Sequence, residues 1–213
     1  MMVFISFKNF RNEELWNGLT HFMGVILSIL GIPFLFYYNN NLTTLSTLSI
    51  ILFAFGLLSV YVNSTIYHLL IYSKLKKSFQ VLDHISIYFL ILGSYAPICL
   101  ITLFESSGKT VFFLVLGLSI LGILKKLFFT GKFKILSLAL YLVMGWAIVF
   151  DLNFLFSLLS FNARLLLVLG GASYTFGVVF YAYDKIKYFH SVWHLFVLTG
   201  SILHYLMILK YII

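Results

Sequence analysis

Seven apolar runs, separated by short polar connectors, are the feature that most constrains the fold of this chain. A bilayer core requires ~20 apolar residues per helical span. The chain is 62% hydrophobic and 9% charged, whereas soluble domains are about 45–50% apolar and about 25% charged. We therefore expect an all-α integral membrane protein, with a single membrane domain over residues 1–213. The seven transmembrane helices are predicted at about 17–38, 45–71, 79–104, 110–125, 135–151, 163–183 and 189–211.

The 14 lysine and arginine residues are distributed unevenly over the connectors. If the N-terminus lies inside, eleven fall on the inner side, namely Lys8, Arg11, Lys74, Lys76, Lys77, Lys125, Lys126, Lys132, Lys134, Lys185 and Lys187. The outer side then holds only Lys109, Arg164 and Lys210. Because cytoplasmic connectors are enriched in Lys and Arg, this predicts a cytoplasmic N-terminus and a C-terminus outside.

The same charge distribution bears on the partners of the protein. We attribute the net charge of +8 to the membrane topology and to contact with anionic lipid, and we expect no nucleic-acid partner. The short connectors imply no soluble protein partner, and they leave the oligomeric state open.

Two histidines, His190 and His194, stand four residues apart at the start of the last apolar run. An ionisable side chain inside a bilayer-length helix is costly, so it is a functional-site hypothesis by default. At positions i and i+4 both imidazoles project from one helix face, which allows one helix to supply two ligands to one metal. The alternative for such a pair is a solvated helix face, which a position within a span disfavours.

Polar residues from other spans fall at a similar depth. We take the nearest charged residue in the sequence as the mark of the inner membrane boundary. His68 is then six residues from Lys74, and Asp83 is six residues from Lys77. His194 is seven residues from Lys187, and His21 is seven residues from Glu14. At 1.5 Å per helical residue, each side chain lies about 9–10 Å inside that boundary. Groups that are far apart in the sequence are therefore predicted to share one layer.

This layer contains a candidate metal site. We expect His68, His190 and His194 to bind Zn²⁺, because three protein ligands with a fourth position left for water are typical of catalytic zinc. Iron and manganese stay open, although an all-imidazole set favours zinc. Asp83 is the candidate general base for the water, or a residue that orients a ligand. Ser64 lies one turn before His68 and can hydrogen-bond Asp83, water or a substrate oxygen.

Each of these assignments has a structural alternative. His68 fits an interfacial residue as well as a ligand. Asp83 could instead be the N-cap of the third helix, if that helix begins there. Ser64 could instead donate to a carbonyl in the preceding turn of its own helix.

Three further histidines have less defined roles. His21, with Asn17 and Thr20, either supports the site or bonds a neighbouring helix. His84 lies about 100° around the helix from Asp83, so packing or support of the site is favoured over ligation. His204 lies in the outer half and is assigned a structural role.

The polar motifs together resemble the hemolysin III family, the bacterial branch of the progestin and adipoQ receptor superfamily. The resemblance covers nearly the whole chain and rests on several motifs in order. These are Glu14-Leu15-Trp16-Asn17-Gly18-Leu19-Thr20-His21 with Gly24, Ser64-Thr65-Ile66-Tyr67-His68, Asp83-His84 leading to Gly93-Ser94-Tyr95-Ala96-Pro97, Gly145-Trp146, Gly170-Gly171 with Tyr174 and Gly177, and His190-Ser191-Val192-Trp193-His194-Leu195-Phe196-Val197 with Gly200 and Ser201.

The resemblance implies seven helices in a bacterial plasma membrane, with zinc near the cytoplasmic face at positions matching His68, His190 and His194. Asp83 matches the acidic residue that holds the metal-bound water, and Ser64 matches the serine beside it. The wider superfamily is similar to alkaline ceramidases and related membrane hydrolases, which implies cleavage of an amide bond in a lipid. We therefore expect a zinc-dependent hydrolase that acts on a lipid amide or ester. Two alternatives stay open. One is a non-catalytic regulator of membrane lipid homeostasis with structural zinc, and the other is the cytolysin or pore-former that the family name suggests.

Overall fold

The computed structural model describes residues 2–70, 74–130 and 132–213, with side chains from residue 12 onward in these ranges. The described residues form helices and turns and contain no strand. The helices are α1 (Met2–Tyr37), α2 (Ser46–Leu69), α3 (Lys74–Pro97), η1 (Ile98–Thr102), α4 (Gly108–Phe129), α5 (Lys134–Gly145), η2 (Ala147–Asp151), α6 (Leu152–Leu158), α7 (Phe161–Ala182) and α8 (Phe189–Tyr211). Within the described ranges, seven segments are long and apolar enough to cross a membrane. The predicted all-α architecture of seven transmembrane helices is therefore confirmed, while the orientation of the termini stays a prediction.

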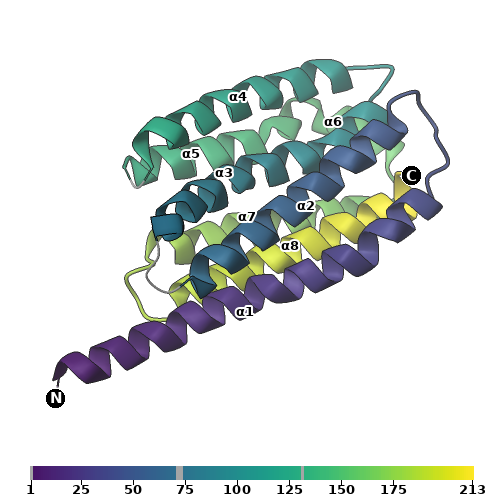
Figure 1. Cartoon of the computed structure of the whole chain (residues 1–213). Coiled ribbons are helices and arrows are strands. Elements are labelled where there is room, and N and C mark those ends of the chain that lie inside the picture. The colour runs from purple at the N-terminus through teal and green to yellow at the C-terminus, as the bar shows by residue number, and fades with distance from the viewer. Residues whose placement is uncertain (1, 71–73, 131) are drawn as a thin grey trace.

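Some spans differ from their predicted bounds. The first helix begins at Met2, well before residue 17, and its N-terminal part projects beyond the other helices (Figure 1). The second helix ends at Leu69, and the last residue predicted for it, 71, lies outside the described residues. The fifth span is predicted to end at 151, but it continues to Leu158 and consists of α5, the 3₁₀-helix η2 and α6.

The fifth span is broken after Gly145, and a tyrosine from α3 stabilises the break. The Tyr95 hydroxyl donates to the carbonyl of Gly145 at 3.0 Å and accepts from the N–H of Ile148 at 3.0 Å. Backbone polar groups at membrane depth must find partners within the protein, because hydrocarbon offers none. The buried Tyr95 side chain therefore replaces the helical hydrogen bonds that the break removes.

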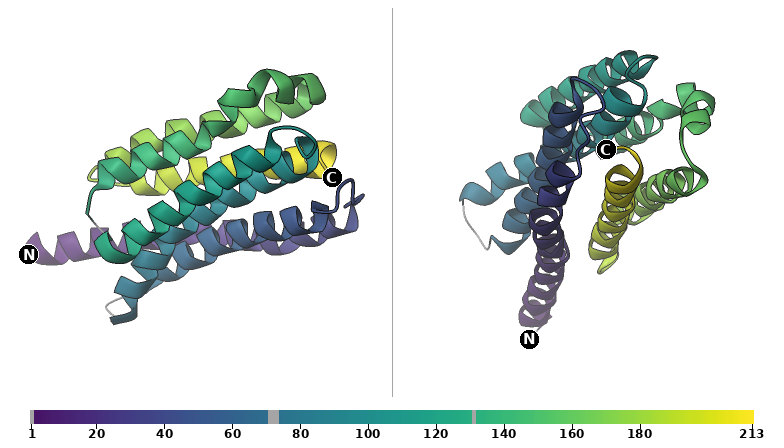
Figure 2. Two further views of the ribbon diagram at one scale, coloured as in Figure 1. Left: turned by 90° about the horizontal axis from the view of Figure 1, so that it is seen from above. Right: turned by 90° about the vertical axis from the view of Figure 1, so that its right-hand side faces the viewer.

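α2 and α8 both pack against α1, and the C-terminal end of α2 comes close to the N-terminal end of α8. α2 packs against α1 and α3, and α8 packs against α1 and α7, while α5 contacts α3, α4 and α7 (Figure 2). α2 and α3 approach each other closely at two glycines, and a Cβ added at Gly56 would lie 2.6 Å from the carbonyl oxygen of Phe89. A Cβ at Gly93 would likewise lie 2.6 Å from the carbonyl oxygen of Leu52. Only glycine allows this approach, which fixes α2 against α3.

Candidate metal centre

Three histidines meet where the C-terminal end of α2 lies beside the N-terminal end of α8. One ring nitrogen from each of His68, His190 and His194 lies within 4.8 Å of the others. The ring centroids are 5.1 Å apart for His68–His190, 5.1 Å for His68–His194 and 4.6 Å for His190–His194. His68 and His194 are buried, and His190 is partly buried. The structure thus brings together the three residues that were predicted as ligands, from helices more than 100 residues apart in the sequence.

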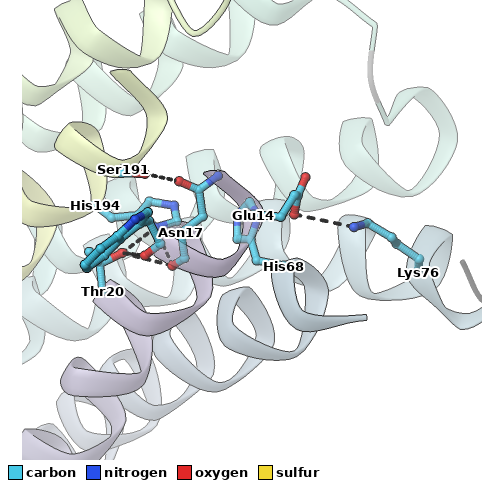
Figure 3. A network of polar contacts seen from close by, with 8 residues as sticks. Glu14, Asn17, Thr20, His68, Lys76, Ser191 and His194 are labelled. Atoms are coloured by element: carbon cyan, nitrogen blue, oxygen red, sulfur yellow. Dashed lines mark hydrogen bonds and ion pairs between the residues drawn. The ribbon is translucent and has the colours of Figure 1, made fainter. Parts of the chain in front are cut away.

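The orientation of His194 is fixed by the first helix. Its Nδ1 lies 3.0 Å from the carbonyl oxygen of Asn17 and 3.2 Å from the Thr20 hydroxyl (Figure 3). A carbonyl oxygen only accepts hydrogen bonds, so Nδ1 carries the proton and donates it. The lone pair of His194 is therefore on Nε2, where a metal can use it.

His68 is held in a similar way, but by a carboxylate. Its Nδ1 lies 2.9 Å from Oε2 of Glu14, and the same oxygen accepts from Lys76 Nζ at 3.4 Å (Figure 3). The opposite ring nitrogen, Nε2, is buried and has no hydrogen-bond partner among the described residues. Because buried polar atoms are nearly always paired, this nitrogen is suited to a ligand.

Two further contacts from α1 fix the start of α8, the helix that carries His190 and His194. The N–H of Tyr188 donates to Oε1 of Glu13 at 2.9 Å. One residue after His190, the Ser191 hydroxyl donates to Oδ1 of Asn17. The first turn of α8 is therefore positioned by polar side chains of α1 as well as by apolar packing.

His21 packs against the cluster without joining it. Its ring stacks on the ring of His194 with centroids 3.6 Å apart, and it lies edge-on to Tyr61 at 5.2 Å. Both of its ring nitrogens are buried and have no partner among the described residues. Of the two roles left open for His21, support of the site is therefore favoured over a hydrogen bond to a neighbouring helix.

Two structural alternatives to the predicted site residues are wrong. α3 begins at Lys74, so Asp83 lies more than two turns inside the helix and is not its N-cap. The Ser64 hydroxyl is fully buried and has no partner among the described residues, so it does not donate to its own preceding turn. Neither residue belongs to the three-histidine group, and Asp83 lines the cavity beside it.

The two remaining histidines also line this cavity. His84 lies next to Asp83, and its backbone carbonyl accepts from the Tyr141 hydroxyl at 3.1 Å. His204 is buried in the C-terminal half of α8 against Gly170, with Nε2 3.4 Å from the carbonyl oxygen of Leu167. Neither is part of the three-histidine group.

A largely apolar cavity of about 210 Å³ extends from the histidine cluster between the helices. His190, His194 and Asp83 line it at one end, and residues nearer the opposite end of the bundle, such as Leu152 and Leu167, line it at the other. The volume is below the about 300–1,000 Å³ of pockets that enclose whole drug-sized ligands. The cavity is therefore too small to enclose a whole ligand of that size.

The residues of the cluster fit a metal ion. They offer three imidazoles, and in His68 and His194 hydrogen bonds at Nδ1 leave Nε2 free. Metal-binding histidines typically donate their other ring N–H to a carboxylate or a backbone carbonyl, and this cluster contains one example of each. Within the described part of the chain the group has three members, which leaves a tetrahedral position for a further ligand.

The position of Glu14 in this arrangement was not predicted from the sequence. It is predicted above to mark the inner membrane boundary, whereas its carboxylate lies beside His68 within the bundle. The reason is that α1 extends past the ends of its neighbours, so a charge on it does not mark their boundary. The spacing of residues does indicate that Glu14 faces the site. Glu14 precedes Asn17 by three residues and His21 by seven, which places all three on one helix face.

The fold and the cluster define a multi-pass helical membrane protein with a candidate metal centre between its second and last membrane helices. The family model described as "Haemolysin-III related" matches residues 9–205. The chain therefore belongs to the haemolysin III family, as its motifs predict, and it is a multi-pass bacterial membrane protein.

Named relatives match over most of their length. The chain is 38% identical over 200 residues to "Hemolysin-3 homolog" of Bacillus subtilis, covering 93% of this chain and 94% of that protein. It is 35% identical over 205 residues to "Hemolysin-3" of Bacillus cereus, covering 96% and 94%. It is 28% identical over 209 residues to human "Monocyte to macrophage differentiation factor", covering 94% and 84%. No solved structure matches the chain significantly.

Proposed function

We propose that this protein is a zinc-dependent hydrolase that cleaves an amide or ester bond of a membrane lipid. The observation that carries the proposal is the position of the three-histidine group at one end of an apolar cavity, with Asp83 at the same end. His68, His190 and His194 would hold the metal. When bound there, Zn²⁺ would polarise a carbonyl and make water a better nucleophile near neutral pH.

The side chains around the cluster have distinct tasks in this reaction. The Asp83 carboxylate takes a proton from the attacking water as its oxygen adds to the carbonyl carbon. The same proton then passes to the nitrogen or oxygen of the leaving group as its bond to carbon breaks. The Ser64 hydroxyl is buried and has no hydrogen-bond partner among the described residues, and it donates a hydrogen bond to the substrate oxygen on which negative charge develops.

The substrate class follows from the cavity and its surroundings. The apolar lining favours a lipid chain, and the small volume favours one chain over two. Gly145 and Gly171 both line the cavity, and a Cβ added at either would meet no atom within 4 Å. These residues lie on the fifth and sixth spans, so a chain would enter from the bilayer between α5 and α7.

The charge count favours a position of the cluster in the inner half of the membrane. The lysines near its helix ends, such as Lys76 and Lys187, belong to the eleven basic residues that the charge count assigns to the cytoplasmic side. The bond to be cleaved would then lie near the inner headgroup boundary.

The test combines metal analysis with lipid turnover on detergent-purified wild-type protein and Asp83→Asn. One zinc per chain in both proteins, with cleavage of a lipid amide or ester only by the wild type, would support the hydrolase. A panel of single-chain and two-chain amides and esters covers the proposed substrate class. Zinc in both proteins with no turnover on this panel would overturn the enzymatic part of the proposal.

A second candidate function is a non-catalytic regulator of membrane lipids in which zinc joins helices. It is favoured by the origin of the ligands, since α2 and α8 each pack against α1 and a shared metal would tie them to each other. In this case chelation should lower the melting temperature of a protein that turns over no lipid. Turnover that is lost on chelation and restored by zinc would instead exclude the regulator.

A further inference from the structure

We infer that Glu14 is a positioning residue for the metal centre, and that its carboxylate fixes His68 in the tautomer that presents Nε2 to the metal. The inference rests on the proposed metal centre, but it does not require that the protein hydrolyses a lipid. Glu14 lies on α1, which contributes none of the three ligands within the described residues.

The contact between Glu14 and His68 is short and sheltered. Glu14 Oε2 is 2.9 Å from His68 Nδ1, and the side chains are 19% and 4% exposed. His68 therefore has one nitrogen bound to a carboxylate, while the other faces the remaining histidines of the cluster and has no hydrogen-bond partner in the described part of the chain. A charge-assisted hydrogen bond of this kind is stronger than a neutral one, and partial burial limits its screening by water.

The tautomer follows from the hydrogen-bonding capacity of the two groups. An ionised carboxylate has acceptors only, so Nδ1 must carry the proton for the contact to be favourable. The opposite tautomer would place a lone pair against the carboxylate and an N–H toward His190 and His194. Glu14 disfavours that form and also makes Nε2 a better electron donor to a metal.

Among the described residues, Glu14 is the only charged side chain that accepts a hydrogen bond from a ring N–H of the three histidines. His194 is held at Nδ1 by the backbone carbonyl of Asn17 and by a hydroxyl, both of which are neutral. The neighbouring carboxylate of Glu13 is used elsewhere, at the N–H of Tyr188. Substitution of Glu14 therefore changes the charge next to the ligands without removing a ligand.

The ion pair with Lys76 is a separate interaction of the same carboxylate. The Lys76 Nζ lies farther from Oε2, at 3.4 Å, and its side chain is 26% exposed. Partly exposed ion pairs contribute little to stability. Lys76→Met therefore removes the ion pair and leaves the His68 contact in place, so it is a matched control.

The experiment measures Zn²⁺ affinity of the full-length protein in detergent by competition with a chromophoric chelator. The proteins are wild type, Glu14→Gln, Glu14→Leu and Lys76→Met. Glutamine keeps an acceptor for Nδ1 but loses the charge, whereas leucine loses both. We expect affinity to fall about 10-fold in Glu14→Gln and toward about 100-fold in Glu14→Leu. Lys76→Met should stay within about fivefold of the wild type.

Two further readouts separate positioning from a general structural role. The melting temperature of the metal-free protein should fall only slightly in Glu14→Gln, since the glutamine amide can still accept from Nδ1 and the ion pair that is lost is partly exposed. The visible absorption of the Co²⁺-loaded protein should change in Glu14→Gln and stay as in the wild type in Lys76→Met. A merely structural residue would lower the melting temperature markedly and leave this spectrum unchanged.

The outcomes distinguish this inference from the proposed function. Tight zinc binding by the wild type together with wild-type affinity in both Glu14 variants would overturn the positioning role alone. Equal losses in Glu14→Gln and Lys76→Met would also overturn it, because the ion pair would then be the relevant contact. If the wild type itself bound no zinc, the metal centre would be wrong and the inference would fail with it.

Discussion

The indole Nε1 of Trp146 donates a hydrogen bond to the hydroxyl of Thr175 at 3.2 Å, across the boundary between the fifth and sixth membrane spans. Both residues line the apolar cavity, and the Trp146 side chain is 52% exposed. Trp146 directly follows the helix break at Gly145 that Tyr95 stabilises. The proposed entry for a lipid chain therefore lies where α5 is interrupted and where a side-chain hydrogen bond links it to α7.

Leucine at the two cavity glycines should block this entry. Gly145→Leu and Gly171→Leu add side chains where a Cβ meets no atom within 4 Å, so the side chain can extend into the cavity without a backbone shift. We expect lipid cleavage to fall while the melting temperature changes by little. Gly117→Leu is the control, because Gly117 on α4 also has open space beside it but does not line the cavity. Full activity in both cavity variants would exclude entry between α5 and α7.

Loss of either histidine on α8 should remove the metal. His190→Ala and His194→Ala each leave two of the three ligands, which is too few for a stable zinc site. The measurement is zinc per chain by plasma mass spectrometry after purification. His204→Gln, outside the three-histidine group, should keep the wild-type stoichiometry. Retention of zinc in His190→Ala and His194→Ala would rule out the assigned ligands.

Ser64→Ala should leave the metal in place and impair the reaction. Its hydroxyl is buried without a partner in the described residues, so its removal breaks no protein hydrogen bond there. We expect unchanged zinc content and a loss of cleavage of about 10–100-fold. The control is Ser119→Ala, because the buried Ser119 hydroxyl donates to the carbonyl of Val115 in its own helix. Zinc loss in Ser64→Ala would show that its role is misassigned.

Tyr95→Phe should destabilise the protein. The substitution leaves the carbonyl of Gly145 and the N–H of Ile148 without the hydroxyl that now pairs with both. Unpaired buried polar groups cost about 1–3 kcal/mol, so the melting temperature should fall. Tyr183→Phe, at a side chain that is 62% exposed, should melt like the wild type. Equal melting temperatures of Tyr95→Phe and the wild type would mean that the break is stabilised by other contacts.

The predicted orientation can be tested with single cysteines in a Cys99→Ser background. A membrane-impermeant maleimide should label Lys210→Cys on intact cells, because the charge count places the C-terminus outside. Lys8→Cys should react only after the membrane is permeabilised. The reverse pattern would place the histidine cluster in the outer half of the membrane.

The membrane class, the number of spans and the histidines of the candidate metal centre could be predicted without a structure. They follow from local properties, namely the length of the apolar runs and the i, i+4 spacing of His190 and His194. In contrast, three contacts became visible only in the folded chain: Glu14 lies against His68, His21 stacks on His194, and Tyr95 stabilises the break after Gly145. These contacts join residues that are far apart in the chain, and they depend on how far each helix is shifted along its neighbours. Apolar side chains of similar size tolerate several such shifts, so hydropathy alone does not select one of them.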